Sequence, residues 1–326
     1  MYAMAMKSWK SGLPLERVEL PTPEPRAREV RVAVHAIGVN PVDWKMREGG
    51  FLGFAARVVR VFRGPRGPVI IGVDFAGVID AVGSQVTGLA AGTRVVGGTN
   101  FARGQHGSYA DTVVVRADQV AALPDAVPFD VAGSLPVAGV TAWMATHDYR
   151  RLEPGRRALI LGASGGVGQF AVQIAKHVCK ADLVAGVCSS KNVELVRGLG
   201  ADVVIDYNAG DPLEQAKAHG PFDLVIDCVG GYRASRCRAL LGSGGRHVMV
   251  AGDSAGAQLQ VIVPPWKSRS ILGAPSGARL APLVAAVAAG QVKVNIAERI
   301  PLVDAEAAHH KSQTGRTSGK LVLMAR

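Results

Sequence analysis

Hydrophobic residues recur at every second position in several short stretches of the first third of the chain, as they do in half-buried β-strands. The clearest case is the stretch 29–37, in which Val30, Val32 and Val34 alternate with other residues. Glycine-rich turns separate the stretches, and no strand–helix alternation interrupts them. The pattern predicts a twisted, barrel-like β domain. Its expected strands cover residues 29–37, 69–73, 78–82, 92–98 and 109–115.

From about residue 123 the pattern changes to apolar strands that alternate with helices, which predicts a parallel sheet and an α/β fold class. A helix is expected over 128–146, another over 193–199 with Gly200 at its end, and a last apolar helix over 281–289. The expected parallel strands cover residues 158–161, 183–188, 203–205, 224–228 and 247–251.

These two patterns divide the chain into two predicted domains. The β-rich domain comprises residues 1–122, and the domain with the parallel sheet comprises residues 123–291. The remaining segment, 292–326, contains an apolar strand at 321–324 and is expected to rejoin the first domain. With 326 residues and 48% hydrophobic content, the chain can bury a large core in each domain.

A glycine-rich turn connects the first parallel strand to the next helix, an arrangement that binds the pyrophosphate of a dinucleotide at the helix amino terminus. Gly162 and Gly165 are expected to take a positive φ or to let the backbone approach a phosphate. Gly168 would let the helix pack closely on the strand. The predicted contacts in this turn are Gly162, Ser164, Gly165, Gly166, Val167 and Gly168.

The second parallel strand ends about twenty residues beyond Gly168, where an acidic residue would bind the ribose of NAD. The residues that follow this strand are instead Ser189, Ser190, Lys191 and Asn192. Hydroxyls and a cation suit a 2′-phosphate, which an adjacent carboxylate would repel. The segment therefore predicts NADP(H) as cofactor, the alternative being an ordinary turn with an exposed lysine.

The formal net charge of +11 suggests an anionic partner, but the arginines are scattered and are not interleaved with aromatic residues. No specific nucleic-acid partner is therefore expected. Arg57, Arg60, Arg63 and Arg66 lie three residues apart, which places them on one helical face. This basic 57–66 segment is interpreted as a lid near the substrate cleft or, alternatively, as a segment attracted to an anionic membrane surface.

The sequence predicts neither a transmembrane segment nor a secretory leader, and a cytoplasmic location is expected. The four cysteines have no CxxC spacing and no histidine grouping, so they are interpreted as free thiols. His309 and His310 are adjacent in a predicted surface helix. No metal site is predicted from these residues.

Several motifs in register resemble one known family. The chain resembles the zinc-free members of the medium-chain dehydrogenase/reductase superfamily, in the quinone-oxidoreductase branch. Within this branch it is similar to the chloroplast-envelope quinone-oxidoreductase homologues and the NADPH-dependent alkenal/one reductases. The resemblance implies a GroES-like domain completed by the carboxy terminus, a Rossmann domain with a doubly wound parallel sheet, and a homodimer. The matching segments are 40–49, 72–78, 135–142, 162–168, 199–207 and 315–322.

The departures from the zinc-dependent members of this superfamily suggest chemistry without a metal. Asn40 stands where those enzymes carry a cysteine ligand, and Gly72-Val73-Asp74 replaces their Gly-His-Glu. Alcohol oxidation then loses its Lewis acid, whereas hydride addition to an activated alkene or a quinone needs none. The resemblance therefore implies an NADPH-dependent reductase of an α,β-unsaturated carbonyl or a quinone.

The matching segment 40–49 contains the predicted catalytic residues. Lys45 and Asp43 could orient the cofactor or polarise a substrate carbonyl, and Asn40 could donate a hydrogen bond to the same oxygen. The alternative is a structural loop in which Asn40 is a cap and Asp43–Lys45 is a surface pair of little energetic value.

The resemblance implies four more cofactor contacts. Thr141 would approach the nicotinamide and Tyr207 the phosphorylated adenosine, while Val229 and Ala251 lie where the fourth and fifth parallel strands end. Two other functions stay open, because a fold does not define an activity. One is a non-catalytic NADPH-binding or interaction protein, and the other is a peripheral membrane-surface protein that uses the basic 57–66 segment.

Overall fold

The computed structural model describes residues 1–9, 12–49, 67–149, 151–250, 267–271 and 273–326, together with Gly53, Val58 and Phe62. The predicted cofactor contact Ala251 and the arginines at 57, 60, 63 and 66 lie outside the described residues. No helix in the described ranges is long and apolar enough to cross a membrane.

The chain divides into two units, each with its own sheets. The first unit comprises Met1–Val140, Ala274–Ala288 and Ile296–Arg326, and the second comprises Thr141–Gly273 and Ala289–Asn295. The first unit thus runs on to Val140, beyond the predicted domain end at residue 122, and helix α3 (Phe129–Gly133) packs on its strands. Helix α10 (Gly277–Ala288) likewise packs on β8 (Val120–Ala122) of that unit.

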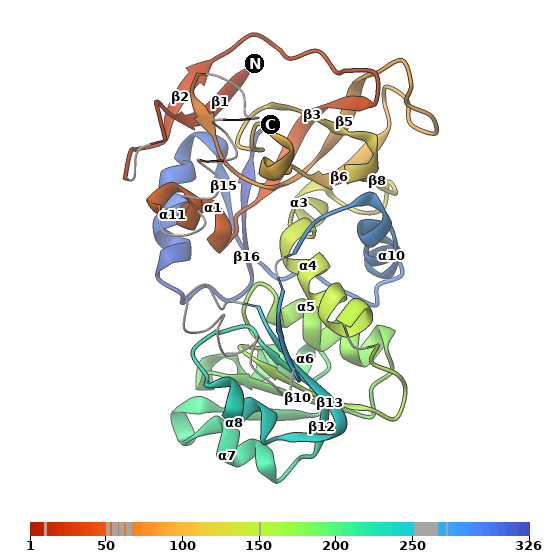
Figure 1. The fold of residues 1–326 in the computed structure, drawn as a ribbon, viewed down its shortest axis with the longest axis vertical. Coiled ribbons are helices and arrows are strands. Elements are labelled where there is room, and N and C mark those ends of the chain that lie inside the picture. Colours follow the sequence, from red (N-terminus) through yellow and green to blue (C-terminus); the bar gives the residue numbers. More distant parts are fainter. Residues whose placement is uncertain are drawn as a thin grey trace. The chain divides into compact units, whose positions relative to one another are not determined.

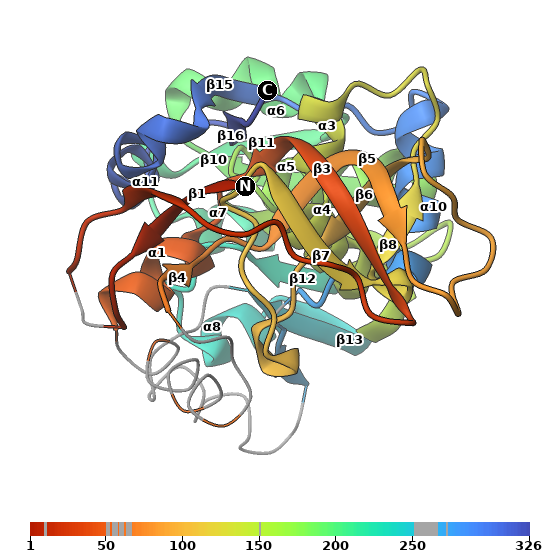
Figure 2. The ribbon, with the colours of Figure 1, turned by 90° about the horizontal axis from the view of Figure 1, so that it is seen from above.

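The first unit is β-rich, as the alternating pattern predicts. Its larger sheet has the strand order β15-β16-β3-β5-β6-β8, with β7 also paired to β3, and its smaller sheet has the order β2-β1-β4. Figure 2 shows β3, β5, β6 and β8 side by side. The strands not yet delimited are β1 (Tyr2–Met6), β2 (Glu16–Glu19), β3 (Glu29–Gly38), β4 (Val69–Ile70), β5 (Asp74–Val82), β6 (Arg94–Gly98), β7 (Thr112–Arg116), β15 (Ile296–Pro301) and β16 (Lys320–Met324).

Strand β3 occupies the centre of this larger sheet. Its valines at 30, 32 and 34 are fully buried and belong to the hydrophobic core of the unit. Near the end of the chain, β16 pairs with the last residues of β3, from Ala36 to Gly38. The helices α1 (Pro41–Glu48) and α11 (Ala305–Gln313), which pack against each other, complete the unit.

The second unit contains a parallel sheet of six described strands in the order β11-β10-β9-β12-β13-β14. This is the doubly wound order, and the predicted α/β fold class is confirmed. The strands are β9 (Arg157–Leu161), β10 (Leu183–Cys188), β11 (Val203–Asp206), β12 (Phe222–Asp227), β13 (Leu241–Met249) and β14 (Ser268–Ser270). The intervening helices are α5 (Gly168–Gln173), α6 (Val193–Gly198), α7 (Pro212–Lys217) and α8 (Ala234–Arg238).

Helices cover both faces of the parallel sheet. On one face, Ala185 and Val187 of β10 share a core cluster with Leu213 of α7 and Cys237 of α8. Figure 1 shows α7 and α8 beside each other, and the Arg236–Asp211 ion pair at 2.6 Å links α8 to the residue before α7. On the other face, Gly186 lies against α6.

The helix predicted over 128–146 is interrupted. Helix α3 ends at Gly133, and α4 (Pro136–Trp143) begins two residues after Ser134 and continues into wider π-type turns over Met144–Tyr149. Proline disfavours helical backbone in the preceding residue but fits the first turn of a helix. Pro136 thus explains both the break and the new start.

The close packing of α5 on the end of β9 can be tested by adding one methyl group. A Cβ on Gly168 would lie 2.1 Å from the carbonyl oxygen of Gly162, whereas a Cβ on Gly198 of α6 would meet nothing within 4 Å. Gly168→Ala should destabilise the protein by about 1–3 kcal/mol, as overpacking does. Gly198→Ala, the matched control, should stabilise it by up to about 1 kcal/mol. Equal shifts in chemical unfolding would contradict this packing.

Candidate active site

Four neighbouring strands of the second unit bring predicted cofactor residues to one edge of the sheet. In spatial order, β11 is followed by Tyr207, β10 by Ser189, β9 by Gly162, and β12, after Cys228, by Val229. The strand order reverses direction between β9 and β12, and open parallel sheets bind ligands outside the carboxyl ends of the strands at such a point. We call this edge, with the residues just named, the cofactor edge.

The glycine-rich turn is held against the neighbouring strand by backbone hydrogen bonds. The amides of Gly162 and Ala163 both donate to the carbonyl of Val187, at 3.1 and 2.8 Å. Gly162 has a φ of +77°, but Gly165 is not in the positive-φ region, so the expected positive φ occurs only at the first glycine. Ser164, Gly165, Gly166 and Val167 are half-buried, and Gly168 is buried.

The residues that follow β10 contact this turn directly. The side-chain amide of Asn192 donates to Ser164 Oγ at 3.0 Å and to Ser189 Oγ at 3.2 Å. Ser190 and Lys191 are exposed at the surface. The structure therefore brings together the two predicted segments that the sequence separates by more than twenty residues.

An acidic residue also reaches this position, contrary to the sequence-based prediction. Ser190 Oγ donates a hydrogen bond to the carboxylate of Asp206, the last residue of β11. The Ser190 hydroxyl and the Asn208 backbone amide hold the pKa of Asp206 below its usual range, so its charge is present at neutral pH. The prediction considered only β10, whereas parallel pairing places Cys188 opposite Asp206.

Two apolar side chains remain exposed at the cofactor edge. Tyr207 is 50% exposed and Val229 is 53% exposed, which makes them unusual among the large hydrophobic residues of the described chain. Val229 also lies against the glycine-rich turn, because a Cβ on Gly162 would come within 2.9 Å of its Cγ2. Thr141, in contrast, is buried within α4.

The predicted catalytic segment of the first unit forms a buried polar cluster. Asn40 donates from its side-chain amide to Asp74 Oδ2 at 2.9 Å and to the Gly38 carbonyl at 3.3 Å. Its Oδ1 accepts from Lys320 Nζ at 2.6 Å, and this ammonium also lies 3.8 Å from Asp74 Oδ2. We call Asn40, Asp43, Asp74 and Lys320 the Asn40 cluster; all four are buried.

Asp43 connects this cluster to a second set of polar residues. It lies in the first turn of α1, where its Oδ2 accepts from the backbone amide of Asn40 at 2.8 Å and from the Tyr109 hydroxyl at 3.3 Å. The same hydroxyl lies 3.0 Å from His309 Nε2. The segment after β3 is therefore a helix and not a loop, and its carboxylate is anchored in the core.

The burial of Asp43 excludes one alternative interpretation of this segment. Asp43 is completely buried, which excludes the surface pair with Lys45, and helix positions two apart point in different directions. His309 is also completely buried, although its neighbour His310 is exposed on the same helix. Lys45 is half-buried, with its ammonium 5.5 Å from the centre of the Trp44 ring.

Burial changes the charge states of this region. Burial, together with repulsion from Asp74, raises the pKa of Asp43 to about 8. Burial also raises the pKa of Asp74 to about 6, although the Lys320 ammonium opposes the shift. Burial lowers the pKa of His309 to about 4, so its imidazole is neutral. Sequence reasoning had not singled out Tyr109, His309 or Lys320 for these roles.

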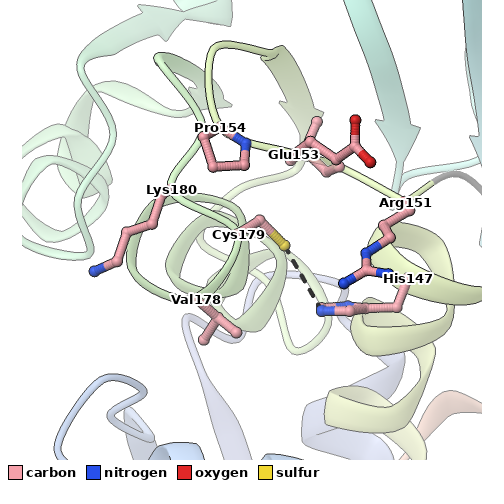
Figure 3. A pocket seen from close by; sticks show the side chains of 8 residues that line it. His147, Arg151, Glu153, Pro154, Val178, Cys179 and Lys180 are labelled. Carbon is pink, nitrogen blue, oxygen red and sulfur yellow. Dashed lines mark hydrogen bonds between the residues drawn. The ribbon is translucent and has the colours of Figure 1, made fainter.

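A separate pocket of about 650 Å³ lies at the amino-terminal side of β9 (Figure 3). It contains none of the predicted site residues. Cys179 Sγ lies 3.9 Å from His147 Nε2 in this pocket. Burial raises the pKa of the Cys179 thiol to about 11, so the thiol is neutral and weakly nucleophilic near pH 7. The pocket thus has no activated nucleophile.

Comparisons with known proteins place these features in a family. The family described as "Alcohol dehydrogenase GroES-like domain" matches residues 26–125, and "Zinc-binding dehydrogenase" matches residues 199–323. The chain is 32% identical to "Chloroplast envelope quinone oxidoreductase homolog" of Arabidopsis thaliana, over 99% of this chain and 98% of that protein. It belongs to the medium-chain dehydrogenase/reductase superfamily, in the quinone-oxidoreductase branch.

Two further proteins show how widely the similarity extends. The chain is 39% identical to human "NAD(P)H oxidoreductase RTN4IP1, mitochondrial", over 62% of this chain and 52% of that protein. The structure of the quinone oxidoreductase from Coxiella burnetii superposes with a TM-score of 0.87 and 30% identity, over 100% of this chain and 99% of that one. The family prediction and the GroES-like plus Rossmann fold class are therefore confirmed.

The Asn40 cluster does not fit the zinc ion that the second family description implies. Zinc in proteins prefers thiolate, imidazole and carboxylate ligands. The cluster offers the amide of Asn40 and the carboxylates of Asp43 and Asp74 but no thiolate or imidazole, and both side-chain amide hydrogens of Asn40 are already donated. The Lys320 ammonium lies between the side chains of Asn40 and Asp74 as their cationic partner. No reaction step is assigned to a metal at this place.

The raised pKa of Asp43 gives the stability of the protein a definite pH dependence. The folded state keeps the carboxyl proton of Asp43 up to about pH 8, whereas the unfolded chain releases it near pH 4. The contribution of this proton to the free energy of unfolding therefore falls as the pH rises between those values. Asp43→Asn removes the titration. Its unfolding free energy relative to wild type should therefore rise from pH 5 to pH 7.5, by up to about 1.4 kcal/mol per pH unit. Denaturant unfolding at several pH values measures this, and parallel pH curves would contradict it.

Proposed function

We propose that this protein is an NADPH-dependent reductase that transfers hydride to a quinone or to the β-carbon of an α,β-unsaturated carbonyl, without a metal. The main support is the glycine-rich turn at the point where the strand order reverses, in a chain that matches quinone-oxidoreductase homologues over nearly its whole length. Bound NADPH supplies the hydride.

The groups at the cofactor edge support NADPH as the proposed cofactor. The backbone amides of residues 163–168 would bind the pyrophosphate, supported by the positive end of the helix that follows. The exposed faces of Tyr207 and Val229 would contact the adenosine. Ser190 and Lys191 would bind the 2′-phosphate, whereas the Asp206 carboxylate opposes it at short range. Thr141 and Ala251 remain proposed contacts to the nicotinamide half.

The acceptor side of the reaction depends on the Asn40 cluster in an indirect way. Both amide hydrogens of Asn40 and one carboxylate oxygen of Asp43 are used inside the protein. These two residues therefore act as positioning residues that hold the start of α1. Lys45, on the same helix and half-buried, is the residue proposed to stabilise negative charge on the carbonyl oxygen. Solvent returns the proton.

Cofactor preference tests the assignment of the cofactor edge. Lys191→Glu should raise the ratio of the NADPH to the NADH dissociation constant by about tenfold or more, because it replaces a phosphate partner with a repelling charge. Asp206→Asn should shift the same ratio in the opposite direction, since it removes the neighbouring carboxylate and keeps the acceptor for Ser190. Fluorescence titration with both cofactors measures the ratio. An unchanged ratio in both variants would remove the two residues from the site.

The reaction itself is tested with a panel of enones and quinones. Purified protein should oxidise NADPH in the presence of at least one class, and chelator treatment at a temperature well below unfolding should leave the turnover within about twofold. Binding of NADPH without any turnover would instead support the non-catalytic NADPH-binding protein. Sedimentation with anionic vesicles would reveal the alternative membrane-surface role of the basic 57–66 segment.

The role of Lys45 is tested in the same assay. Lys45→Ala should lower kcat on the order of 10²-fold, the usual cost of losing a group that stabilises an oxyanion, with the cofactor affinity unchanged. Lys217→Ala is the matched control, because Lys217 is an exposed lysine of α7 that pairs with Glu214. If both variants keep normal kinetics, Lys45 has no catalytic role.

A homodimer and a cytoplasmic location remain predictions for this chain. The names of two relatives place those proteins in the chloroplast envelope and in mitochondria, so the compartment differs within the family.

A further inference from the structure

Three buried side chains with metal-binding groups converge in the second unit. Asp227 ends β12, Cys237 lies on α8 and His247 lies on β13. A carboxylate oxygen, the thiol sulfur and an imidazole nitrogen from these residues all lie within 4.8 Å of one another. All three residues are completely buried.

Two of these polar atoms have no hydrogen-bond partner. Asp227 Oδ2 and His247 Nε2 are both buried and unpartnered in the described structure. The other carboxylate oxygen, Oδ1, accepts from the amides of Val229 and Gly230, each at 2.9 Å. Buried polar atoms are nearly always satisfied, and an exception commonly marks a bound ion or water. Both orphaned atoms belong to the same three-residue group.

The surroundings of His247 suit a metal ligand. Its Nδ1 lies 3.0 Å from Ser268 Oγ, and Arg238 donates to the same oxygen at 3.2 Å. When Nδ1 carries the proton and donates to Ser268, the buried Nε2 keeps a lone pair that can bind a metal. Metal-bound histidines usually donate their second ring N–H to a polar group in this way.

We propose that Asp227 Oδ2, Cys237 Sγ and His247 Nε2 bind one zinc ion. Thiolate, imidazole and carboxylate together are ligands typical of Zn²⁺, whereas Mg²⁺ and Ca²⁺ prefer oxygen ligands alone. Ligands in a tetrahedral zinc site lie at about 2.0–2.3 Å from the ion, so small side-chain movements would complete the shell. Binding forms the Zn–S bond and releases the thiol proton to solvent. A solvent molecule takes the fourth position.

The ion would link side chains of three consecutive elements, β12, α8 and β13. β12 and β13 pair in parallel, with Val225 opposite His247. Helix α8, which lies between the two strands in the sequence, packs on β13. Zinc would hold the end of β12 to α8 and β13 and would compensate the buried Asp227 charge. No step of the proposed hydride transfer uses this ion, although Asp227 also holds the backbone amide of Val229 at the cofactor edge.

Metal content and a cobalt spectrum test the site on the full-length protein. After chelation and dialysis, added Zn²⁺ should bind at one ion per chain and raise the melting temperature by several degrees. Added Co²⁺ should produce a near-ultraviolet thiolate-to-cobalt charge-transfer band. Cys237→Ser should lose this band and at least tenfold in zinc affinity. The matched control Cys179→Ser changes a buried cysteine outside the cluster and should keep both.

Asp227→Asn offers a second variant in case Cys237→Ser does not fold, because the amide oxygen can still accept from Val229 and Gly230. It should also lose at least tenfold in zinc affinity. The proposal is overturned if wild-type protein shows neither stoichiometric Zn²⁺ binding nor a thiolate band, which would leave water in the site. Stoichiometric zinc of unchanged affinity in both variants would overturn it as well, since the ion would then lie elsewhere.

Discussion

The parallel pairing of β9 with β10 on one side and β12 on the other is the constraint on which the cofactor edge depends. β9 pairs in register with β10 through Leu161 opposite Val187, and with β12 through Leu161 opposite Asp227. Since parallel strands end at the same edge, the turns after all three strands must lie together. Backbone hydrogen bonds between the strands therefore bring three segments to that edge, independently of their side chains. These are the glycine-rich turn, the 189–192 segment and the loop with Val229.

The same pairing explains the three-residue group proposed to bind zinc. Asp227 is the residue at which β12 ends. Its Oδ1 accepts from the backbone amides of the next loop, and its Oδ2 is buried in the interior. β13 then returns in parallel beside β12, and α8 crosses between them. A short strand–helix–strand segment thereby brings together side chains that lie ten and twenty residues apart in the sequence.

The first unit shows how burial changes the chemistry of ordinary residues. Asn40, Asp74 and Lys320 satisfy one another's hydrogen bonds inside the core, at the residue that caps α1. Isolated buried charges are costly, and a cation between an amide and a carboxylate reduces that cost. Burial and repulsion from Asp74 raise the pKa of Asp43 further than that of Asp74, whose shift the Lys320 ammonium opposes. Lys45, on the same helix, is half-buried and lies beside the Trp44 ring.

The sequence by itself determined the α/β class, the β-rich first unit, the glycine-rich turn and the family, because these depend on local periodicity and on short motifs. Short stretches of sequence are enough to recognise them, as with the alternating valines of β3 and the glycines at 162 and 168. Only the tertiary structure decided which side chains meet: Asp206 with Ser190, His309 with Tyr109, and Asp227 with Cys237 and His247. These contacts join different strands and helices, and a one-dimensional pattern contains no information on the distance between them. Burial, and with it the charge of Asp43, is likewise a property of the packed core and not of the residue type.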